Sequence, residues 1–151
     1  MADRILRVLL VDDDEDDFVL ARELLEDVEG TAYEVEWANE FDAALERMKS
    51  ATHHVCFLDY NLGSRTGLDL LRAATADGVD TPVIMFTGQR DRETDMEAMR
   101  AGAYDYLVKG RFDGALLERT IRYVLNRKEI ERALRASNEK LERANLRIQE
   151  N

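Results

Sequence analysis

The sequence is poor in the features that would place this chain in several protein classes. It has one cysteine, Cys56, in 151 residues, so no disulfide framework can form within it. No apolar run is long enough to span a bilayer, and Met1–Arg4 lead into a short apolar segment rather than a signal peptide. Basic residues are also scarce: 21 Lys and Arg stand against 32 Asp and Glu, and the net charge of −11 argues against nonspecific nucleic-acid binding. We therefore expect a cytoplasmic protein that binds neither a membrane nor nucleic acid directly.

Short apolar runs alternate with helical patterns along the chain, which predicts an α/β fold with a parallel sheet. The run Tyr33–Trp37 alternates apolar and charged residues, so we place it at an edge of the sheet. We expect Asn39 to cap the helix that follows this run. The expected strands are 5–11, 33–38, 55–58, 82–87 and 105–108, and the expected helices are 15–28, 40–50, 66–76, 92–101 and 112 onward.

Five polar side chains lie where apolar runs end. Asp12 and Asp13 follow the first run, Asp59 the third, Thr87 the fourth and Lys109 the fifth. The strands of a parallel sheet all end at one edge, and ligands bind at that edge. We therefore expect three carboxylates, a hydroxyl and an ammonium group to converge on one point.

These residue types together suit phosphoryl acceptance by an aspartate. Carboxylates that share a cleft repel one another, and Mg²⁺ relieves the repulsion because it prefers oxygen ligands. One carboxylate can then attack phosphorus as a nucleophile, while the lysine and the metal neutralise charge on the transferring oxygens. The threonine hydroxyl can hydrogen-bond the phosphoryl group once it is attached.

The acidic run Asp12–Asp17 has an alternative interpretation as an EF-hand calcium loop, because Asp12, Asp14, Asp16 and Glu23 match ligand positions of that loop. The sixth position of such a loop is glycine, for a sharp turn, and here it is Asp17. A strand rather than a helix also precedes the run. We favour the start of a helix, where carboxylates interact well with the positive end of the helix dipole.

The site residues lie in motifs that resemble those of the receiver domain of bacterial two-component response regulators. The four segments are Val11-Asp12-Asp13, Leu58-Asp59-Tyr60-Asn61-Leu62, Phe86-Thr87-Gly88 and Tyr106-Leu107-Val108-Lys109. They occur in the family's order, each at a strand end, and the resemblance covers roughly residues 4–126. It implies a doubly wound (βα)5 flavodoxin-like three-layer sandwich with strand order 2-1-3-4-5 and an extended C-terminal helix.

The resemblance also implies a chemical role for each site residue. Asp59 is the phosphoacceptor, and Lys109 pairs first with Asp59 and then with the phosphoryl group. Asp13 binds Mg²⁺ directly and Asp12 acts mainly through water. Asp59 and the backbone carbonyl of Asn61 complete the protein's share of the metal ligands.

Two further residues form the switch in this family. The hydroxyl of Thr87 moves toward the phosphoryl group, and the ring of Tyr106 turns inward behind it. Asn61 and Gln89 occupy positions that influence the rate of dephosphorylation.

The function implied by the resemblance is that of a phosphorelay signalling switch. A sensor histidine kinase or histidine phosphotransfer protein supplies the phosphoryl group, and the C-terminal helix passes on a conformational or dimerisation signal. The domain is not an enzyme in the usual sense, because it catalyses only its own phosphoryl transfer and dephosphorylation.

Two other functions use a similar set of residues. Haloacid-dehalogenase-like phosphatases also have a strand-end aspartate, but they need a second Asp two residues later as acid and base, and this chain has Asn61 there. A pseudo-receiver that takes no phosphate is the other alternative, and the complete residue set argues against it.

The chain departs from the family pattern at two loops. The family usually has proline after the lysine, often with a cis peptide bond, whereas Gly110 follows Lys109 here. The loop of residues 61–67 also lacks the family's common proline, so we expect it to be less rigid.

The segment 127–151 is expected to continue the last helix as a short coiled coil or a linker to an output domain. Leu134, Leu141 and Ile148 recur every seven residues, which favours a homodimer through this helix. With these three at heptad position d, Asn138 and Asn145 fall at a; with them at a, Ser137 and Ala144 fall at d. The sequence leaves both registers open, together with a single unpaired helix.

Overall fold

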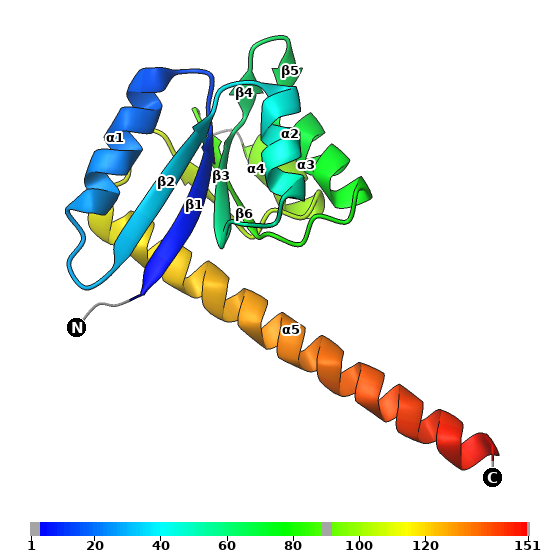
Figure 1. Cartoon of the computed structure of the whole chain (residues 1–151). Helices are drawn as coiled ribbons and strands as arrows, with labels where there is room; N and C mark the ends of the chain where they lie inside the picture. Colours follow the sequence, from blue (N-terminus) through cyan, green and yellow to red (C-terminus); the bar gives the residue numbers. More distant parts are fainter. Residues whose placement is uncertain (1–3, 89–91, 151) are drawn as a thin grey trace.

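The computed structural model describes residues 4–88 and 92–150 and shows a sheet flanked by helices (Figure 1). Its elements are β1 (Ile5–Val11), α1 (Glu15–Glu26), β2 (Ala32–Ala38), α2 (Phe41–Lys49), β3 (Val55–Asp59), β4 (Asn61–Leu62), β5 (Arg65–Thr66), α3 (Gly67–Ala76), β6 (Val83–Thr87), α4 (Arg92–Arg100), β7 (Asp105–Val108) and α5 (Gly114–Glu150). The main sheet is parallel and has the order β2-β1-β3-β6-β7. This confirms the expected order 2-1-3-4-5, since β4 and β5 form a separate small hairpin.

Burial along each strand follows its place in the sheet. Every residue of β3 and β6 is buried, as expected for central parallel strands covered on both faces. The strand β2 is only partly buried and lies at the edge, which confirms the inference drawn from its alternating pattern. Cys56 lies in β3, and complete burial raises the pKa of its thiol to about 12.

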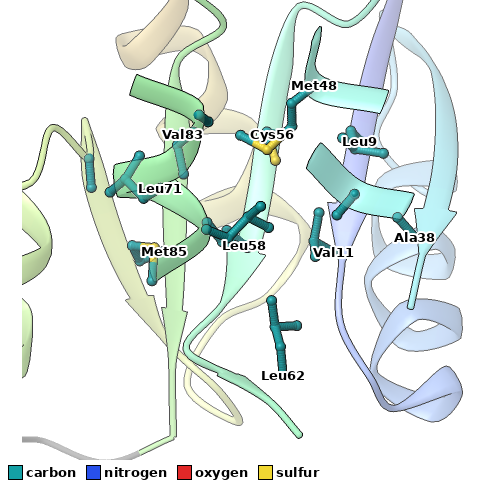
Figure 2. Close-up of a cluster of buried hydrophobic side chains, with 14 of the residues drawn as sticks. Leu9, Val11, Ala38, Met48, Cys56, Leu58, Leu62, Leu71, Val83 and Met85 are labelled. Atoms are coloured by element: carbon teal, nitrogen blue, oxygen red, sulfur yellow. The ribbon is translucent and has the colours of Figure 1, made fainter. Parts of the chain in front are cut away.

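Two apolar cores lie on the two faces of the sheet. The first is covered by α2, α3 and α4, and Figure 2 shows β1 and β3 contributing Leu9, Val11, Cys56 and Leu58 to it. The second is covered by α1 and α5, through Phe18, Ala21 and Leu25 on α1 and Leu117, Ile121 and Val124 on α5. The resulting three layers confirm the predicted sandwich.

Two local features differ from the sequence-based expectation. The hairpin of β4 and β5 was not expected, because strands of two residues are too short to show a periodic pattern. Asn39 is not the cap of α2: Glu40 occupies that position, and its side chain makes no capping hydrogen bond. The prediction for Asn39 was therefore wrong by one position.

Gly67 begins α3 directly against the strand that carries Asp59. Its N–H donates to the carbonyl of Tyr60 at 2.6 Å, and a Cβ at this position would overlap the carbonyl of Asp59. Only glycine allows this approach of backbone to backbone. Thr66 caps the helix in a capping box with Asp69, so the loop that follows Asp59 is closed by a well-defined helix start.

The helix α5 docks on the sheet with its first half and then projects beyond the body of the molecule (Figure 1). Polar contacts among Lys128, Asp80, Tyr104 and Glu131, which we call the basal clamp, fix α5 to the body of the molecule where the helix begins to project. Lys128 Nζ donates to Asp80 Oδ1 at 2.6 Å and to the hydroxyl of Tyr104 at 3.3 Å, and that hydroxyl donates to Glu131.

No helix in the described part of the chain is long and apolar enough to cross a membrane.

Candidate functional site

The predicted site residues meet at the carboxyl edge of the sheet. Asp12 and Asp13 directly follow β1, Asp59 ends β3, Thr87 ends β6, and Lys109 directly follows β7. Carboxylate oxygens of Asp12, Asp13 and Asp59 all lie within 4.8 Å of one another. Asp59 therefore joins Asp12 and Asp13 in one acidic cluster, although it is far from them in the sequence, because β1 and β3 are parallel neighbours.

Asp12 is fixed firmly by the backbone around it. Its side chain is fully buried, and Oδ1 accepts a hydrogen bond from the Asp14 N–H at 2.9 Å. Its carbonyl accepts from Trp37 Nε1 at 2.8 Å. Burial raises the pKa of Asp12, and the contact with Lys109 opposes this effect. Asp13, in contrast, is exposed at the mouth of the cluster.

Asp59 is nearly buried, and its environment resists ionisation. Burial and the neighbouring charge of Asp12 raise its pKa to about 6, while Lys109 and the backbone N–H of Asn61 act in the opposite direction. The cluster therefore has more negative charge than its own cation can balance. A site of this kind has a physical reason to bind a hard divalent cation.

Lys109 is the central cation of the site and contacts three carboxylates. Its Nζ lies 2.6 Å from Asp17 Oδ2, 2.9 Å from Asp12 Oδ2 and 3.2 Å from Asp59 Oδ2. The Asp12 contact is an ion pair that is poorly aligned for a hydrogen bond. Burial alone would lower the pKa of Lys109, but the contacts with Asp17, Asp12 and Asp59 raise it.

Asp17 is the site residue that the sequence analysis missed. It belongs to the first turn of α1, whose N-terminus Asp14 caps by accepting from the Asp16 N–H at 2.9 Å. This confirms the helix start that we favoured over an EF-hand loop. The sequence offered six acidic residues in a row and no means of choosing the one that turns toward a lysine 92 positions away.

Thr87 and Tyr106 lie differently with respect to the cluster. The side chain of Thr87 is buried, and its Oγ1 has no hydrogen-bond partner among the described residues. Tyr106 pairs with Met85 in the sheet and is 39% exposed, beside Met96 and Met99 of α4. The structure thus shows an outward-facing Tyr106 that is not part of the acidic cluster.

The remaining expectations concern the loops around the site. Asn61 lies in β4, where its backbone N–H acts to lower the pKa of Asp59, and Gln89 lies outside the described residues. The Lys109–Gly110 peptide bond is trans, and Gly110 has φ of +79°. Proline is locked near −65° and cannot adopt this conformation, so the glycine gives this loop a different path.

The chain matches the family model of the response regulator receiver domain over residues 8–122. It is 39% identical over 103 residues to the alginate biosynthesis transcriptional regulatory protein AlgB of Pseudomonas syringae pv. tomato, covering 68% of this chain and 22% of that protein. It is 38% identical over 104 residues to the nitrogen assimilation regulatory protein NtrX of Azorhizobium caulinodans, with the same coverage. The chain thus spans about a fifth of the length of these curated relatives.

Solved structures agree with this match. A CheY-like response regulator receiver domain protein from Methanospirillum hungatei JF-1 superposes with a TM-score of 0.73 at 29% identity, covering 84% of this chain and 98% of that one. NtrX from Brucella abortus superposes with a TM-score of 0.75 at 30% identity, covering 86% of this chain and 29% of that one.

Proposed function

The chain belongs to the response regulator receiver domain family, and we propose that it is a switch that accepts a phosphoryl group on Asp59 in a phosphorelay. The observation that carries this proposal is the meeting of three carboxylates, a buried hydroxyl and Lys109 at one edge of the sheet. The donor is a sensor histidine kinase or a histidine phosphotransfer protein. The net charge of −11 argues against nonspecific nucleic-acid binding.

In the proposed transfer, an oxygen of Asp59 attacks the phosphorus of a phosphohistidine. The new P–O bond forms as the P–N bond breaks, and the imidazole of the donor leaves with the electron pair. Lys109 Nζ, 3.2 Å from Asp59 Oδ2, is close enough to neutralise charge on the incoming phosphoryl oxygens. Thr87 Oγ1 is the buried donor that the attached phosphoryl group would engage.

The acidic cluster fits Mg²⁺ by the chemistry of its donors. Asp12, Asp13 and Asp59 provide oxygens within 4.8 Å of one another and exceed the charge of Lys109. We assign Asp13 and Asp59 as direct ligands, with Asp12 acting through water and Asn61 through its backbone carbonyl. When bound, Mg²⁺ neutralises charge between the carboxylates and the phosphoryl oxygens.

The proposed signal begins at Thr87 and reaches the outer surface through Tyr106. Thr87 pairs with Val108 in the sheet, so a shift of its hydroxyl acts on the strand that carries Tyr106. The exposed ring of Tyr106 then turns inward, and the surface that it shares with Met96 and Met99 changes.

The proposed output is a parallel pairing of α5 with a second copy of this chain, and the basal clamp supports one of the two open registers. With Leu134 at position d, Glu131 would occupy an a position in the seam, but Glu131 bonds Tyr104 on the receiver side. With Leu134 at position a, Ile130 falls at position d. The a and d positions that would form the seam of the dimer are then Ile130, Leu134, Ser137, Leu141, Ala144 and Ile148, of which the four large apolar side chains are exposed.

Light scattering of the intact chain tests the coupling between site and helix. We expect the molar mass with Mg²⁺ to rise toward that of a dimer when beryllofluoride, which imitates the phosphoryl group, is added. Asp59→Asn should abolish the response, because the ligand that carries beryllium is removed. A dimer in both conditions would mean that the signal is a change of geometry within a standing coiled coil, and a monomer in both would contradict an output by dimerisation.

A further inference from the structure

The contacts of Lys109 contain one carboxylate that the proposed phosphorylation does not use. Lys109 Nζ lies within 3.2 Å of three carboxylates, but it donates a well-aligned hydrogen bond only to Asp17. The contact with Asp17 is the shortest, at 2.6 Å, and the contact with Asp59 is the longest, at 3.2 Å. A phosphoryl group on Asp59 has to draw the Lys109 ammonium group toward itself, and the hydrogen bond to Asp17 is the contact that opposes this movement most directly.

We propose that Asp17 is a positioning residue that holds Lys109 on the α1 side of the site and releases it to the phosphoryl group. This inference rests on the proposed function of Asp59. It makes Asp17 a competitor of the phosphoryl group for the same ammonium group, so that Asp17 sets how strongly the site retains its ligand.

The burial of the three carboxylates identifies Asp17 as the exchangeable partner. The side chain of Asp12 is fully buried and that of Asp59 is 6% exposed, so either would lose its cation in a poorly hydrated place. The side chain of Asp17 is 37% exposed, and water can solvate its carboxylate after release.

The location of Asp17 in α1 also favours release. It lies in the first turn of the helix, where the positive end of the helix dipole stabilises a carboxylate that has no other cation. The turn is held independently by the Asp14 cap, so the helix start does not depend on the Asp17–Lys109 contact.

The chain supplies a matched control and an internal reporter. Asp16 is the exposed neighbour of Asp17 in the same turn, and Asp16→Asn removes the same charge without touching the Lys109 contact. Trp37 is the only tryptophan. Its indole donates to the Asp12 carbonyl at 2.8 Å and stacks on Phe18 at 5.3 Å between ring centroids, so its fluorescence should report binding in the cluster.

The test is a beryllofluoride titration of the full chain at saturating Mg²⁺, followed by Trp37 fluorescence. We expect the beryllofluoride concentration at half-saturation to be about threefold lower for Asp17→Asn than for wild type, which is the size of effect for a partly exposed ion pair. Asp16→Asn should stay close to wild type, and Asp17→Glu should restore the wild-type midpoint because it restores the carboxylate. Equal shifts for Asp17→Asn and Asp16→Asn, or a higher midpoint for Asp17→Asn, would overturn the proposal.

A second measurement needs no phosphoryl analogue and separates this proposal from the proposed function. In the ligand-free protein, the NMR signal of the Lys109 ammonium group should shift in Asp17→Asn and stay in place in Asp16→Asn. An unchanged signal in Asp17→Asn overturns the inference whatever the titration gives. If Asp17→Asn shows the shift but the wild-type chain never binds beryllofluoride, the role of Asp59 is contradicted and the inference about Asp17 is not.

Discussion

Two lysines lie at opposite edges of the same sheet, and their surroundings are reversed in charge. Lys109, at the carboxyl edge, is one cation among the carboxylates of Asp12, Asp17 and Asp59. Lys128, at the other edge, shares the single carboxylate of Asp80 with Arg132 and Arg135. The first cluster has spare negative charge and can take a metal or exchange a partner. At the second, three cations share the carboxylate of Asp80, and Lys128 ties α5 to the sheet.

The difference in burial fits the two roles. The side chain of Lys109 is 24% exposed, so a ligand can reach it, whereas that of Lys128 is 6% exposed. Asp80 lies shortly before β6, and Tyr104 lies directly before β7. The basal clamp therefore joins α5 to the starts of these two strands. At their other ends, β6 carries Thr87 and β7 leads into Lys109. β6 and β7 thus connect the carboxyl edge of the sheet with the helix α5.

Replacing each lysine by methionine should give the largest difference between the two edges, measured as the rate of phosphoryl uptake. Lys109→Met should slow phosphoryl uptake from acetyl phosphate by about a hundredfold, since it removes the charge that stabilises the transferring oxygens. Lys128→Met should leave uptake close to wild type, because it lies at the other edge of the sheet. Radiolabel incorporation with Mg²⁺ measures both rates, and a comparable loss in both variants would contradict the division of roles.

The clamp also predicts which face of α5 meets a second copy. Ser137→Cys should form an intermolecular disulfide readily, and the adjacent Asn138→Cys should form far less, because only Ser137 lies in the seam opposite the clamped face. The native thiol of Cys56 is buried, with a pKa of about 12, and will not interfere. Non-reducing electrophoresis measures the fraction of crosslinked dimer in each variant. More crosslinking at residue 138 would establish the other register.

Removing the carboxylate of the clamp should lower stability without affecting the site. Asp80→Asn leaves the buried Lys128 ammonium without its anion and should reduce the free energy of unfolding by about 1–2 kcal/mol, less than for a fully buried pair because half of Asp80 is hydrated. Asp77→Asn is the control: it removes an exposed pair with Lys49 and should change stability by less than about 0.5 kcal/mol. Urea unfolding of the three proteins measures the difference. Equal losses would show that the clamp is only a surface contact.

The difference in unfolding free energy between wild type and Asp80→Asn should also depend on pH, with a smaller effect. The hydrogen bond from Lys128 holds the pKa of Asp80 below its ordinary value of 3.8. The stabilisation is therefore fully present above pH 3.8 and is lost as the pH falls through the lower pKa of the folded state. The difference in stability between wild type and Asp80→Asn should be constant near neutral pH and should shrink below about pH 4. A difference that grows on acidification would contradict the ion pair.

The two regions also differ in how far the sequence could reveal them. The strand-end positions of Asp12, Asp59, Thr87 and Lys109 were readable because each terminates an apolar run, and the parallel sheet brings those ends together. The order of the strands came from the resemblance, since hydrophobic patterns do not specify which strands are neighbours.

The contacts that the sequence could not reveal depend on side chains far apart along the chain. Asp17 meets Lys109 across 92 positions, and Asp80 meets Lys128 across 48. Neither pair has a local pattern that would distinguish it, because 35% of the residues in this chain are charged. Gly67 was missed for a similar reason: its need for a bare backbone arises only from the approach of Asp59.

The central claim is that Asp59 takes a phosphoryl group with Mg²⁺, and intact-mass spectrometry after incubation with acetyl phosphate tests it most directly. We predict that the wild-type chain gains the mass of one phosphoryl group, that chelation of Mg²⁺ prevents the gain, and that Asp59→Asn shows none. Mapping of the modified peptide should place the group on the segment that contains Asp59. Undiminished uptake by Asp59→Asn, or an unmodified wild type in the presence of Mg²⁺, would contradict the account.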